Sequence, residues 1–280
     1  MNNCVNNILC VFLATFLVVR ISAVITHPNN NQVIDSRIVG GKVVNIIQYP
    51  HQISLRTRDI TEPQQSYAHS CGGSIYSQRI VITASHCIER SKRNELMVVV
   101  GTNLRSGIDG VIVPVQEILM HEEYGPERTT NDIALLVLAA ELPINNITIK
   151  PIELTDMQPQ PGEIATITGW GVNAEGDSPD FLHEVQVPII SHEICKQSYP
   201  NRITDDMLCA GLLGVGGKDA CKKDSGGPLL INGKLAGVVS WGSGCGLPNF
   251  PGVYANVWYL LPWLRETIAK VEAAILRGDY

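Results

Sequence analysis

Short apolar segments separated by turns recur along most of this chain, and they constrain its fold more than any other feature. Each segment spans four to eight residues, and glycine and proline, of which the chain has 25 and 16, are plentiful between them. Apolar segments of this length bounded by turn-forming residues predict β-strands. Many short strands at such spacing suit barrels, in which closure removes exposed edges. We therefore predict an all-β protein.

The predicted strands fall into two groups, joined by a polar, proline-containing connection over residues 143–161. The first group comprises residues 52–56, 73–77, 80–84, 96–100, 111–118 and 133–138. The second comprises residues 164–169, 183–189, 207–211, 228–231, 234–240 and 252–256. Leu260, Leu264 and Ile268 then recur every four residues, which predicts an amphipathic helix packed against the second group. These patterns predict β-rich halves at about 38–145 and 160–257, followed by a helix at about 258–270.

The N-terminal segment differs in composition from the rest. Residues 8–19 form an apolar run that is closed by Arg20 and followed by Ile21-Ser22-Ala23. The run is short for a membrane span but suits the core of a signal peptide, residues 1–23, cleaved after Ala23. No Lys or Arg precedes the run, so an uncleaved anchor is the alternative. Residues 24–37 are polar and lack cysteine, which indicates an activation propeptide. We expect a secreted, extracellular protein with no membrane attachment in its mature form.

The formal net charge is −6, and it becomes −7 when residues 1–37 are removed. No basic stripe or arginine-rich run occurs in the sequence. Proteins that bind nucleic acids carry such basic patches. We therefore expect no nucleic-acid partner.

Six cysteines remain after the predicted signal peptide, which contains Cys4 and Cys10. They are Cys71, Cys87, Cys195, Cys209, Cys221 and Cys245. An even number in a secreted chain predicts disulfides, but six cysteines allow fifteen pairings. A zinc site is disfavoured because there is no Cys-x-x-Cys pair, and thiols oxidise outside the cell. Asp109 is the only carboxylate in residues 102–109, too few for a strong calcium site. We expect no metal and no cofactor.

The candidate nucleophile is Ser225, which lies between an aspartate and two glycines. Such a serine can occupy a tight turn with its hydroxyl exposed and backbone N–H groups beside it, as acyl transfer requires. Alone, this tetrapeptide would usually be an ordinary polar turn. His86 within Thr-Ala-Ser-His-Cys and Asp132 within Asn-Asp-Ile-Ala-Leu-Leu supply the missing partners. Singly, His86 would be a structural histidine and Asp132 a polar cap before a strand.

These segments, with Arg-Ile-Val-Gly-Gly at 37–41, Gly-Trp-Gly at 169–171 and Ser-Trp-Gly at 240–242, resemble the motifs of trypsin-like serine proteases of the chymotrypsin clan. The resemblance, which includes arthropod trypsins, runs from Ile38 to about Ile268 in family order. It implies a peptidase domain over residues 38–280, with two six-stranded antiparallel β-barrels and a C-terminal α-helix. The order His–Asp–Ser argues against an α/β-hydrolase, which needs Gly-x-Ser-x-Gly where this chain has Lys223.

The resemblance also implies residue roles. Ser225 would be the nucleophile, His86 the general base and then acid, and Asp132 the group that orients the imidazole. The backbone N–H groups of Lys223 and Ser225 would form the oxyanion hole, although the family expects glycine at the position of Lys223. The implied disulfides are Cys71–Cys87, Cys195–Cys209 and Cys221–Cys245.

Substrate-binding positions follow from the same resemblance. Asp219 matches the acid at the base of the primary pocket, where it would pair with Arg or Lys. The alternative for Asp219 is a surface aspartate in a glycine-rich loop. Gly242 and Gly252 match glycines that keep the pocket walls open, and Tyr199 matches an aromatic beneath them. Ser240 matches the residue that steadies the triad aspartate.

Arg37 and Ile38 match an activation site. Cleavage would free the Ile38 ammonium to pair with Asp224 inside the protein. His69 and Ser54 match residues that hold Asp224 before activation, but they could equally be plain polar groups on strands.

The residues and the family resemblance together predict a secreted, zymogen-activated serine endopeptidase that cuts after Arg or Lys. Digestion is the favoured role, and venom and defence roles stay open. The alternative is a protease-like binding or regulatory protein weakened at Lys223. We expect protein and peptide substrates with Arg or Lys at the cut, an activating protease, protein inhibitors and a monomeric state. Lys222 beside Lys223 predicts a preference for acidic residues on the leaving side of the scissile bond.

Overall fold

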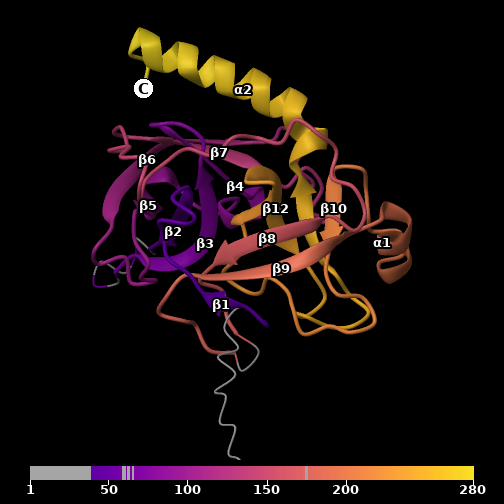
Figure 1. Ribbon diagram of the computed structural model, residues 1–280. Coiled ribbons are helices and arrows are strands. Elements are labelled where there is room, and N and C mark those ends of the chain that lie inside the picture. The colour runs from indigo at the N-terminus through magenta and orange to yellow at the C-terminus, as the bar shows by residue number, and fades with distance from the viewer. Residues whose placement is uncertain (1–38, 59–60, 62–63, 65, 174–175) are drawn as a thin grey trace, which may run out of the picture. The chain divides into compact units, whose positions relative to one another are not determined.

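The computed structural model describes residues 39–58, 61, 64, 66–173 and 176–280 (Figure 1). The predicted signal peptide and propeptide, with Arg37 and Ile38, lie outside the described residues. Across the described ranges, no helix has both the length and the apolar character that crossing a membrane demands.

The first barrel contains six antiparallel strands: β2 (Gln52–Thr57), β3 (Ala68–Ile75), β4 (Ile80–Thr83), β5 (Leu96–Val100), β6 (Val111–Met120) and β7 (Ala134–Leu138). Their order is β2-β3-β4-β7-β6-β5, and pairing of β5 with β2 closes the barrel. Alternate residues point inward, because successive side chains of a strand face opposite sides. Ile53, Leu55, Val98, Val100 and Leu136 are among the fully buried residues of this core.

The second barrel contains β8 (Ile164–Gly169), β9 (His183–Ile190), β10 (Met207–Ala210), β11 (Pro228–Ile231), β12 (Lys234–Trp241) and β13 (Gly252–Asn256). The order is β9-β10-β13-β12-β11-β8, and β8 pairs again with β9 to close it. A short strand, β1 (Lys42–Val43), adds to the other edge of β9. The prediction of two six-stranded antiparallel barrels with a C-terminal helix is confirmed.

The start of β3 is the boundary in the first barrel that differs most from the sequence prediction. Strand β3 begins at Ala68, five residues before the predicted start, because His69 and Cys71 pair with Arg56 and Leu55 of β2. Residues 68–72 include His69 and Ser70, so they lack the apolar run from which a strand is predicted. A 3₁₀-helix, η1 (Ser85–Cys87), follows β4, and a second, η2 (Arg93–Glu95), precedes β5.

A short helix in the second half, α1 (His192–Ser198), was not predicted from the sequence. Its first turn is capped by Ser191, whose hydroxyl accepts a hydrogen bond from the N–H of Ile194 at 3.3 Å. Serine is a favoured N-cap because its oxygen satisfies an otherwise free backbone donor.

The C-terminal helix α2 (Val257–Arg277) is longer than predicted and continues seven residues past Lys270. Buried Val271 and Ala274 extend the helical period, and Gly278 ends the helix with a left-handed φ of 80°. Its apolar face packs in one core with Ile80 and Leu135 of the first barrel and with residues of the second. In Figure 1, α2 (yellow) runs along the side of the molecule that carries β6 and β7. The helix therefore bridges the two barrels.

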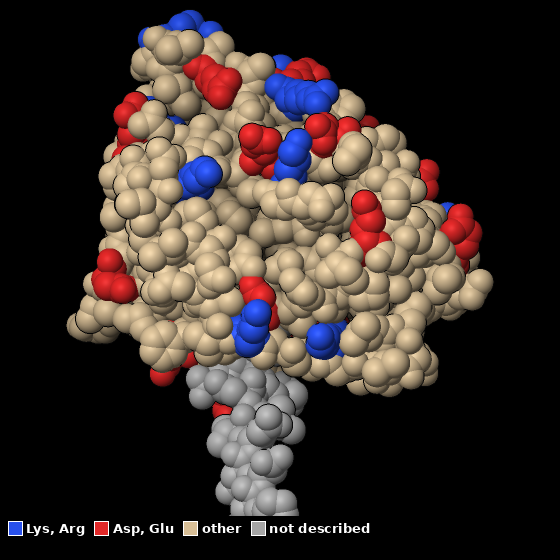
Figure 2. Space-filling model, in the orientation of Figure 1, with Lys and Arg blue, Asp and Glu red and all other residues tan. Residues whose placement is uncertain are grey.

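Three disulfides form among the described residues, and they are the three pairs that the resemblance implied. Cys71–Cys87 joins β3 to η1, Cys195–Cys209 joins α1 to β10, and Cys221–Cys245 joins two loops beside Ser225 and Trp241. On the described face shown in Figure 2, blue and red side chains are interspersed, without a broad area of one sign.

Candidate active site

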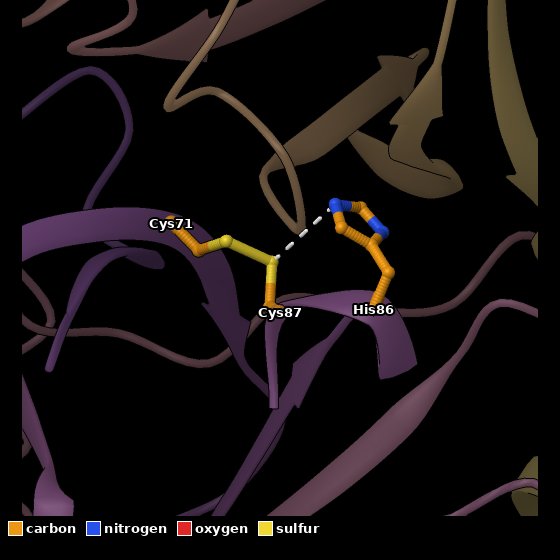
Figure 3. Close-up of side chains that lie close together, drawn as sticks. All are labelled: Cys71, His86 and Cys87. Carbon is orange, nitrogen blue, oxygen red and sulfur yellow. Dashed lines mark hydrogen bonds between the residues drawn. A yellow bond between two sulfur atoms is a disulfide. The ribbon is translucent and has the colours of Figure 1, made fainter. Parts of the chain in front are cut away.

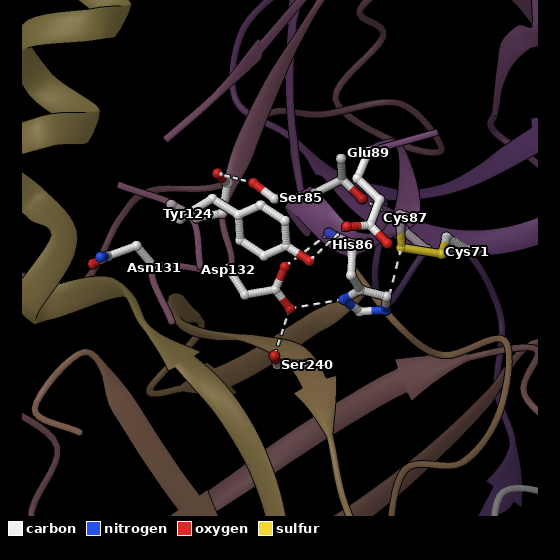
Figure 4. A network of polar contacts seen from close by, with 12 residues as sticks. Cys71, Ser85, His86, Cys87, Glu89, Tyr124, Asn131, Asp132 and Ser240 are labelled. Carbon is white, nitrogen blue, oxygen red and sulfur yellow. Dashed lines mark hydrogen bonds and ion pairs between the residues drawn. A yellow bond between two sulfur atoms is a disulfide. The ribbon is translucent and has the colours of Figure 1, made fainter. Parts of the chain in front are cut away.

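His86 and Asp132 are brought together by the pairing of β4 with β7. Thr83 of β4 lies opposite Ala134 of β7, so the residues just after β4 and just before β7 meet at one end of the barrel. The Asp132 carboxylate accepts hydrogen bonds from the His86 backbone N–H at 2.9 Å and from His86 Nδ1 at 2.7 Å. Ser240 of β12 donates a third, at 2.5 Å (Figure 4). Three donors therefore hold one buried carboxylate and set the orientation of the imidazole.

Two residues that sequence reasoning did not place in the site help to position these groups. The buried Ser85 hydroxyl donates to the Ile133 carbonyl at 2.7 Å, which ties η1 to the segment carrying Asp132 (Figure 4). The Asn131 N–H donates to Asp206 Oδ2 at 2.6 Å, and Asn131 has a left-handed φ of 50°. Asparagine tolerates this backbone region better than most residues.

The pKa of His86 reflects opposing effects. Burial disfavours the imidazolium, but the hydrogen bond and charge of Asp132, together with the charge of Glu89, outweigh it and raise the pKa. In Figure 4, Glu89 and the Tyr124 ring lie close to His86, and the Tyr124 hydroxyl donates to Glu89 Oε2 at 3.3 Å. An imidazole with a raised pKa is the stronger proton acceptor.

Ser225 lies on a tight turn that presses against the end of β4. Its carbonyl accepts a hydrogen bond from the Gly72 N–H of β3 at 2.7 Å. Gly226 has a φ of 77°, and a Cβ there would come within 2.3 Å of Thr83 Oγ1 and 3.2 Å of the Ala84 nitrogen. The turn therefore reaches the segment immediately before His86. Within the described residues, no hydrogen bond joins the Ser225 hydroxyl to His86, and such contacts often tighten only when substrate is bound.

Cys71, His86 and Cys87 also form a compact cluster of potential metal ligands (Figure 3). His86 Nε2 lies 3.8 Å from Cys87 Sγ. Both cysteines belong to one disulfide, so neither offers the thiolate that binds zinc. The donor set does not fit a metal, and the disulfide instead packs beside the imidazole.

Lys223 adopts a left-handed backbone with a φ of 78°, in the region where glycine is favoured. Its carbonyl accepts a hydrogen bond from His69 Nε2 at 3.1 Å, and His69 Nδ1 lies 2.8 Å from the Ser54 hydroxyl. Burial lowers the pKa of His69 to about 3, so this histidine is neutral. The Lys223 ammonium donates to Ser178 Oγ at 3.1 Å. The His69 bond to the Lys223 carbonyl and the Ser178 bond to its ammonium thus hold a lysine in the left-handed conformation, at a position where the family expects glycine.

A cavity of about 250 Å³ opens beside Ser225 and is lined by Asp219, Ser240, Gly242 and Gly252. Gly242 and Gly252 face each other, because a Cβ on Gly242 would lie 3.9 Å from the Gly252 Cα. A Cβ on Gly252 would come within 2.6 Å of Asp219 Oδ1. These glycines therefore leave the carboxylate accessible from the cavity.

Asp219 is 3% exposed and is not a surface residue. Its Oδ2 accepts a hydrogen bond from the Gly246 N–H at 2.9 Å, while Oδ1 has no hydrogen-bond partner among the described residues. Burial raises the pKa of Asp219 to about 7, against the opposing effect of the N–H groups of Gly246 and Ala220. A buried carboxylate that lacks a partner favours a cationic ligand.

Two tyrosines support this cavity. Tyr199 does not line the cavity itself, but its hydroxyl donates to the Pro251 carbonyl at 2.7 Å and accepts from the Ser243 N–H at 3.2 Å, beside Gly252 and Gly242 of the lining. Tyr254 lines the cavity with a buried hydroxyl that has no partner within the described part of the chain. Sequence reasoning missed Tyr254, although it follows Gly252 by two residues on one strand and so faces the same side.

Asp224 is buried behind the candidate nucleophile. Its carboxylate accepts hydrogen bonds from the Gly171 N–H at 2.7 Å and the Cys221 N–H at 2.9 Å. Burial raises its pKa to about 7 despite these two donors. The first described residue, Val39, contacts the loop before Asp224, because its carbonyl accepts a hydrogen bond from the Asp219 N–H at 3.2 Å. No ion pair to Asp224 occurs among the residues that the structure describes.

Comparisons with known proteins agree with this geometry. The family model described as Trypsin matches residues 38–264. Trypsin zeta of Drosophila melanogaster is 49% identical over 243 residues, 84% of this chain and 87% of the relative. Trypsin eta of Drosophila erecta is 42% identical over 266 residues, 94% of this chain and 100% of the relative. Trypsin alpha-4 of Lucilia cuprina is 42% identical over 243 residues, 85% of this chain and 90% of the relative. The chain belongs to the trypsin family and is a serine endopeptidase.

Proposed function

We propose that this protein is a secreted, zymogen-activated endopeptidase that cleaves peptide bonds after Arg or Lys. The observation that supports the specificity is the buried Asp219 carboxylate, one oxygen of which has no hydrogen-bond partner in the described part of the chain, at a cavity beside Ser225. An Arg or Lys side chain would satisfy that oxygen, whereas an apolar side chain would leave a buried charge unpaired.

Catalysis follows from the residues around this cavity. Ser225 Oγ attacks the substrate carbonyl while its proton passes to His86 Nε2, and Asp132 stabilises the imidazolium. The N–H groups of Lys223 and Ser225 stabilise the oxyanion of the tetrahedral intermediate. His86 returns the proton to the leaving amine, which departs and leaves an acyl-enzyme. Water then attacks the ester with His86 again as base, releasing the acid and restoring Ser225.

Activation would occur by cleavage between Arg37 and Ile38. Asp224 is a fully buried carboxylate whose described partners are backbone N–H groups. A new ammonium at Ile38 would neutralise it, and breaking such a buried pair costs about 3–5 kcal/mol. Because Asp224 directly follows Lys223, this pairing would stabilise the turn that carries the oxyanion donors.

The remaining assignments are consistent with this function. Three disulfides suit an oxidising, extracellular location, reached through a signal peptide at residues 1–23. Residues 24–37 would be the propeptide and residues 38–280 the peptidase domain. The expected partners are an activating protease, protein substrates and protein inhibitors of a monomeric enzyme. A purely regulatory protein is not favoured, because His86, Asp132 and Asp219 keep the contacts that hydrolysis requires.

Peptide anilides provide the test. Precursor activated with a trace of trypsin, which is then removed, should hydrolyse arginyl and lysyl anilides and leave a phenylalanyl anilide nearly untouched. Asp219→Asn should reduce kcat/KM for the arginyl substrate by about 100- to 5,000-fold, as expected for loss of a buried ion pair worth about 3–5 kcal/mol. Ser225→Ala should abolish hydrolysis of all three. Preferred cleavage of the phenylalanyl anilide, or an unaffected Asp219→Asn variant, would contradict the proposal.

A further inference from the structure

A tryptophan at the mouth of the cavity carries a stacked arginine. Trp241 is the last residue of β12, follows Ser240 directly and lines the cavity together with Ser225. Its ring makes an edge contact with Tyr199, with centroids 4.8 Å apart. The Arg202 guanidinium carbon lies 4.1 Å from the centroid of the Trp241 ring. Stacking on an aromatic face is a favoured arrangement for arginine and fixes the position of its charge.

The turn that presents Arg202 is itself well defined. The Arg202 N–H donates to the Tyr199 carbonyl at 3.2 Å, and Asn201 between them has a left-handed φ of 61°. Tyr199 is buried and hydrogen-bonded beneath the cavity. The backbone that carries the arginine is thus anchored to the buried Tyr199.

The charge of Arg202 is available for a ligand. Arg202 is exposed, and no carboxylate of the described chain forms an ion pair with it. A guanidinium offers several N–H donors in one plane, which match the two oxygens of a carboxylate. The chemistry of this position therefore favours an acidic side chain.

The backbone beside Trp241 can guide an extended peptide past Arg202. Pairing of β12 with β11 ends at Val238, and Val239 bonds to Gly226 and Gly227 of the turn that holds Ser225. Among the described residues, no strand pairs with this edge of Ser240 and Trp241, so a peptide could add there as a strand. Trp241 lines the cavity that would hold the first residue, so the residues before the cut in such an extended peptide would run along Trp241, on whose ring Arg202 is stacked.

We propose that Arg202 selects substrates with Asp or Glu at the third residue before the cut, counting the residue bound by Asp219 as the first. This inference rests on the proposed cleavage after Arg or Lys. The sequence of the chain supplies a matching segment, because Ile34-Asp35-Ser36-Arg37 precedes the expected activation site. Asp35 is the third residue, so the mature enzyme would recognise the propeptide of a second copy of this chain.

Matched peptides test the selectivity. Mature enzyme should cleave Ile-Asp-Ser-Arg anilide about two- to fivefold faster in kcat/KM than Ile-Asn-Ser-Arg anilide, the effect of an exposed ion pair. The advantage should vanish in Arg202→Gln and at 0.5 M salt. It should persist in Arg277→Gln, which removes an exposed arginine at the end of α2. The proposal would be overturned if the wild-type enzyme cleaved the Asp and Asn peptides equally, or if Arg202→Gln kept the preference for the Asp peptide. It would also be overturned if Asp-Ile-Ser-Arg anilide were cleaved faster than Ile-Asp-Ser-Arg anilide.

The full chain provides a second test. Precursor carrying Ser225→Ala cannot process itself, so it reports only cleavage by added mature enzyme. Wild-type enzyme should convert the Ser225→Ala precursor faster than a precursor that carries both Ser225→Ala and Asp35→Asn, by the factor found for the peptides. Arg202→Gln enzyme should convert the two precursors at the same rate. If no arginyl peptide is cut at all, the proposed function fails; if both are cut equally, only the role of Arg202 is refuted.

Discussion

Two buried aspartates in this protein show how burial changes the pKa of a carboxyl group and its need for a partner. Asp219 and Asp224 both lie in the interior, and burial raises the pKa of each to about 7. Asp224 has two backbone donors, whereas Asp219 has one oxygen facing a cavity. The same residue type can therefore be suited to an internal cation at one position and to a substrate cation at the other.

The raised pKa of Asp219 predicts pH-dependent binding of cations. Below about pH 7 the free carboxyl is largely protonated and neutral, and above it the carboxylate can pair with an amidinium. Benzamidine affinity should therefore increase as the pH rises from 5.5 to 8, and binding near pH 6 should release a proton. Calorimetry in buffers of different ionisation enthalpy measures both. An Asp219→Asn variant should bind weakly at every pH; a wild-type affinity that is constant over this range would contradict the prediction.

Lys223 is the clearest departure from the family pattern. Replacing it with glycine relieves a left-handed conformation but adds freedom to the unfolded chain, so we expect the free energy of unfolding to change by no more than about 1 kcal/mol. The predicted preference for Glu over Arg just after the cut should decrease, because a positive charge is lost. Competition between two such peptides measures the preference.

Ser178→Ala is the control for Lys223. It removes the hydrogen bond to the Lys223 ammonium but keeps the charge, so the preference for Glu should remain. If the wild-type enzyme cleaves the Glu and Arg peptides equally, the prediction from the sequence is wrong.

At the scale of secondary-structure elements, β4, β7 and α2 connect the two barrels. The strands are buried on both faces: Val81 and Leu136 point into the first barrel, whereas Ile82 and Leu135 belong to the core shared with α2. Strands covered on both faces are expected to be apolar at every position. This explains the uninterrupted apolar sequence of β7 and why α2 extends across the first barrel.

Mutations in α2 should distinguish its two faces. Ile268 is 3% exposed in the shared core, so Ile268→Ala should lower the free energy of unfolding by about 2–5 kcal/mol. Leu276 is 88% exposed, and Leu276→Ala should change it by less than about 0.5 kcal/mol. Urea unfolding measures the free energy of unfolding of both variants. The kcat per titrated active site should be unchanged in each of them. Equal effects of the two mutations would contradict the bridging role of α2.

At the scale of the whole molecule, the first described residues contact the loop that carries Asp219. The first described residues reach this region, since the Val39 carbonyl accepts from the Asp219 N–H and a Cβ on Gly40 would come within 2.2 Å of the Gly217 carbonyl oxygen. The loop that carries Asp219 therefore packs on the segment that follows the expected cleavage site. Cleavage at Arg37 would thereby act on the cavity and on the Asp224 turn together.

Arg37→Gln should leave an inactive precursor. Without a free ammonium at Ile38, the buried Asp224 stays unpaired, and a cost of about 3–5 kcal/mol corresponds to a loss of activity of about 100-fold or more. Hydrolysis of an arginyl anilide and labelling by a fluorophosphonate probe measure this loss. Wild-type precursor treated with the same trace of trypsin is the control. Appreciable activity of the uncleaved variant would refute the switch.

The sequence pattern was sufficient for most of the strands, and the family resemblance was sufficient for the three disulfides. The resemblance also proposed the site residues, of which the structure brings His86, Asp132 and Ser240 together. Alternation of side chains and turn-forming residues are local properties, so they can be read without coordinates. The early start of β3, the helix α1 and the full length of α2 were not read correctly, because tertiary pairing and packing determine where these elements begin and end.

Only the tertiary structure decided how Lys223 is accommodated, which oxygen of Asp219 is free, and where Arg202 stacks. Each of these depends on contacts between residues distant in the sequence, such as His69 with Lys223 or Arg202 with Trp241. Closure of the two barrels creates those contacts, and their energies depend on burial and geometry. Residue types therefore set the available chemistry of this protein, whereas packing sets the charge, accessibility and partners of each group.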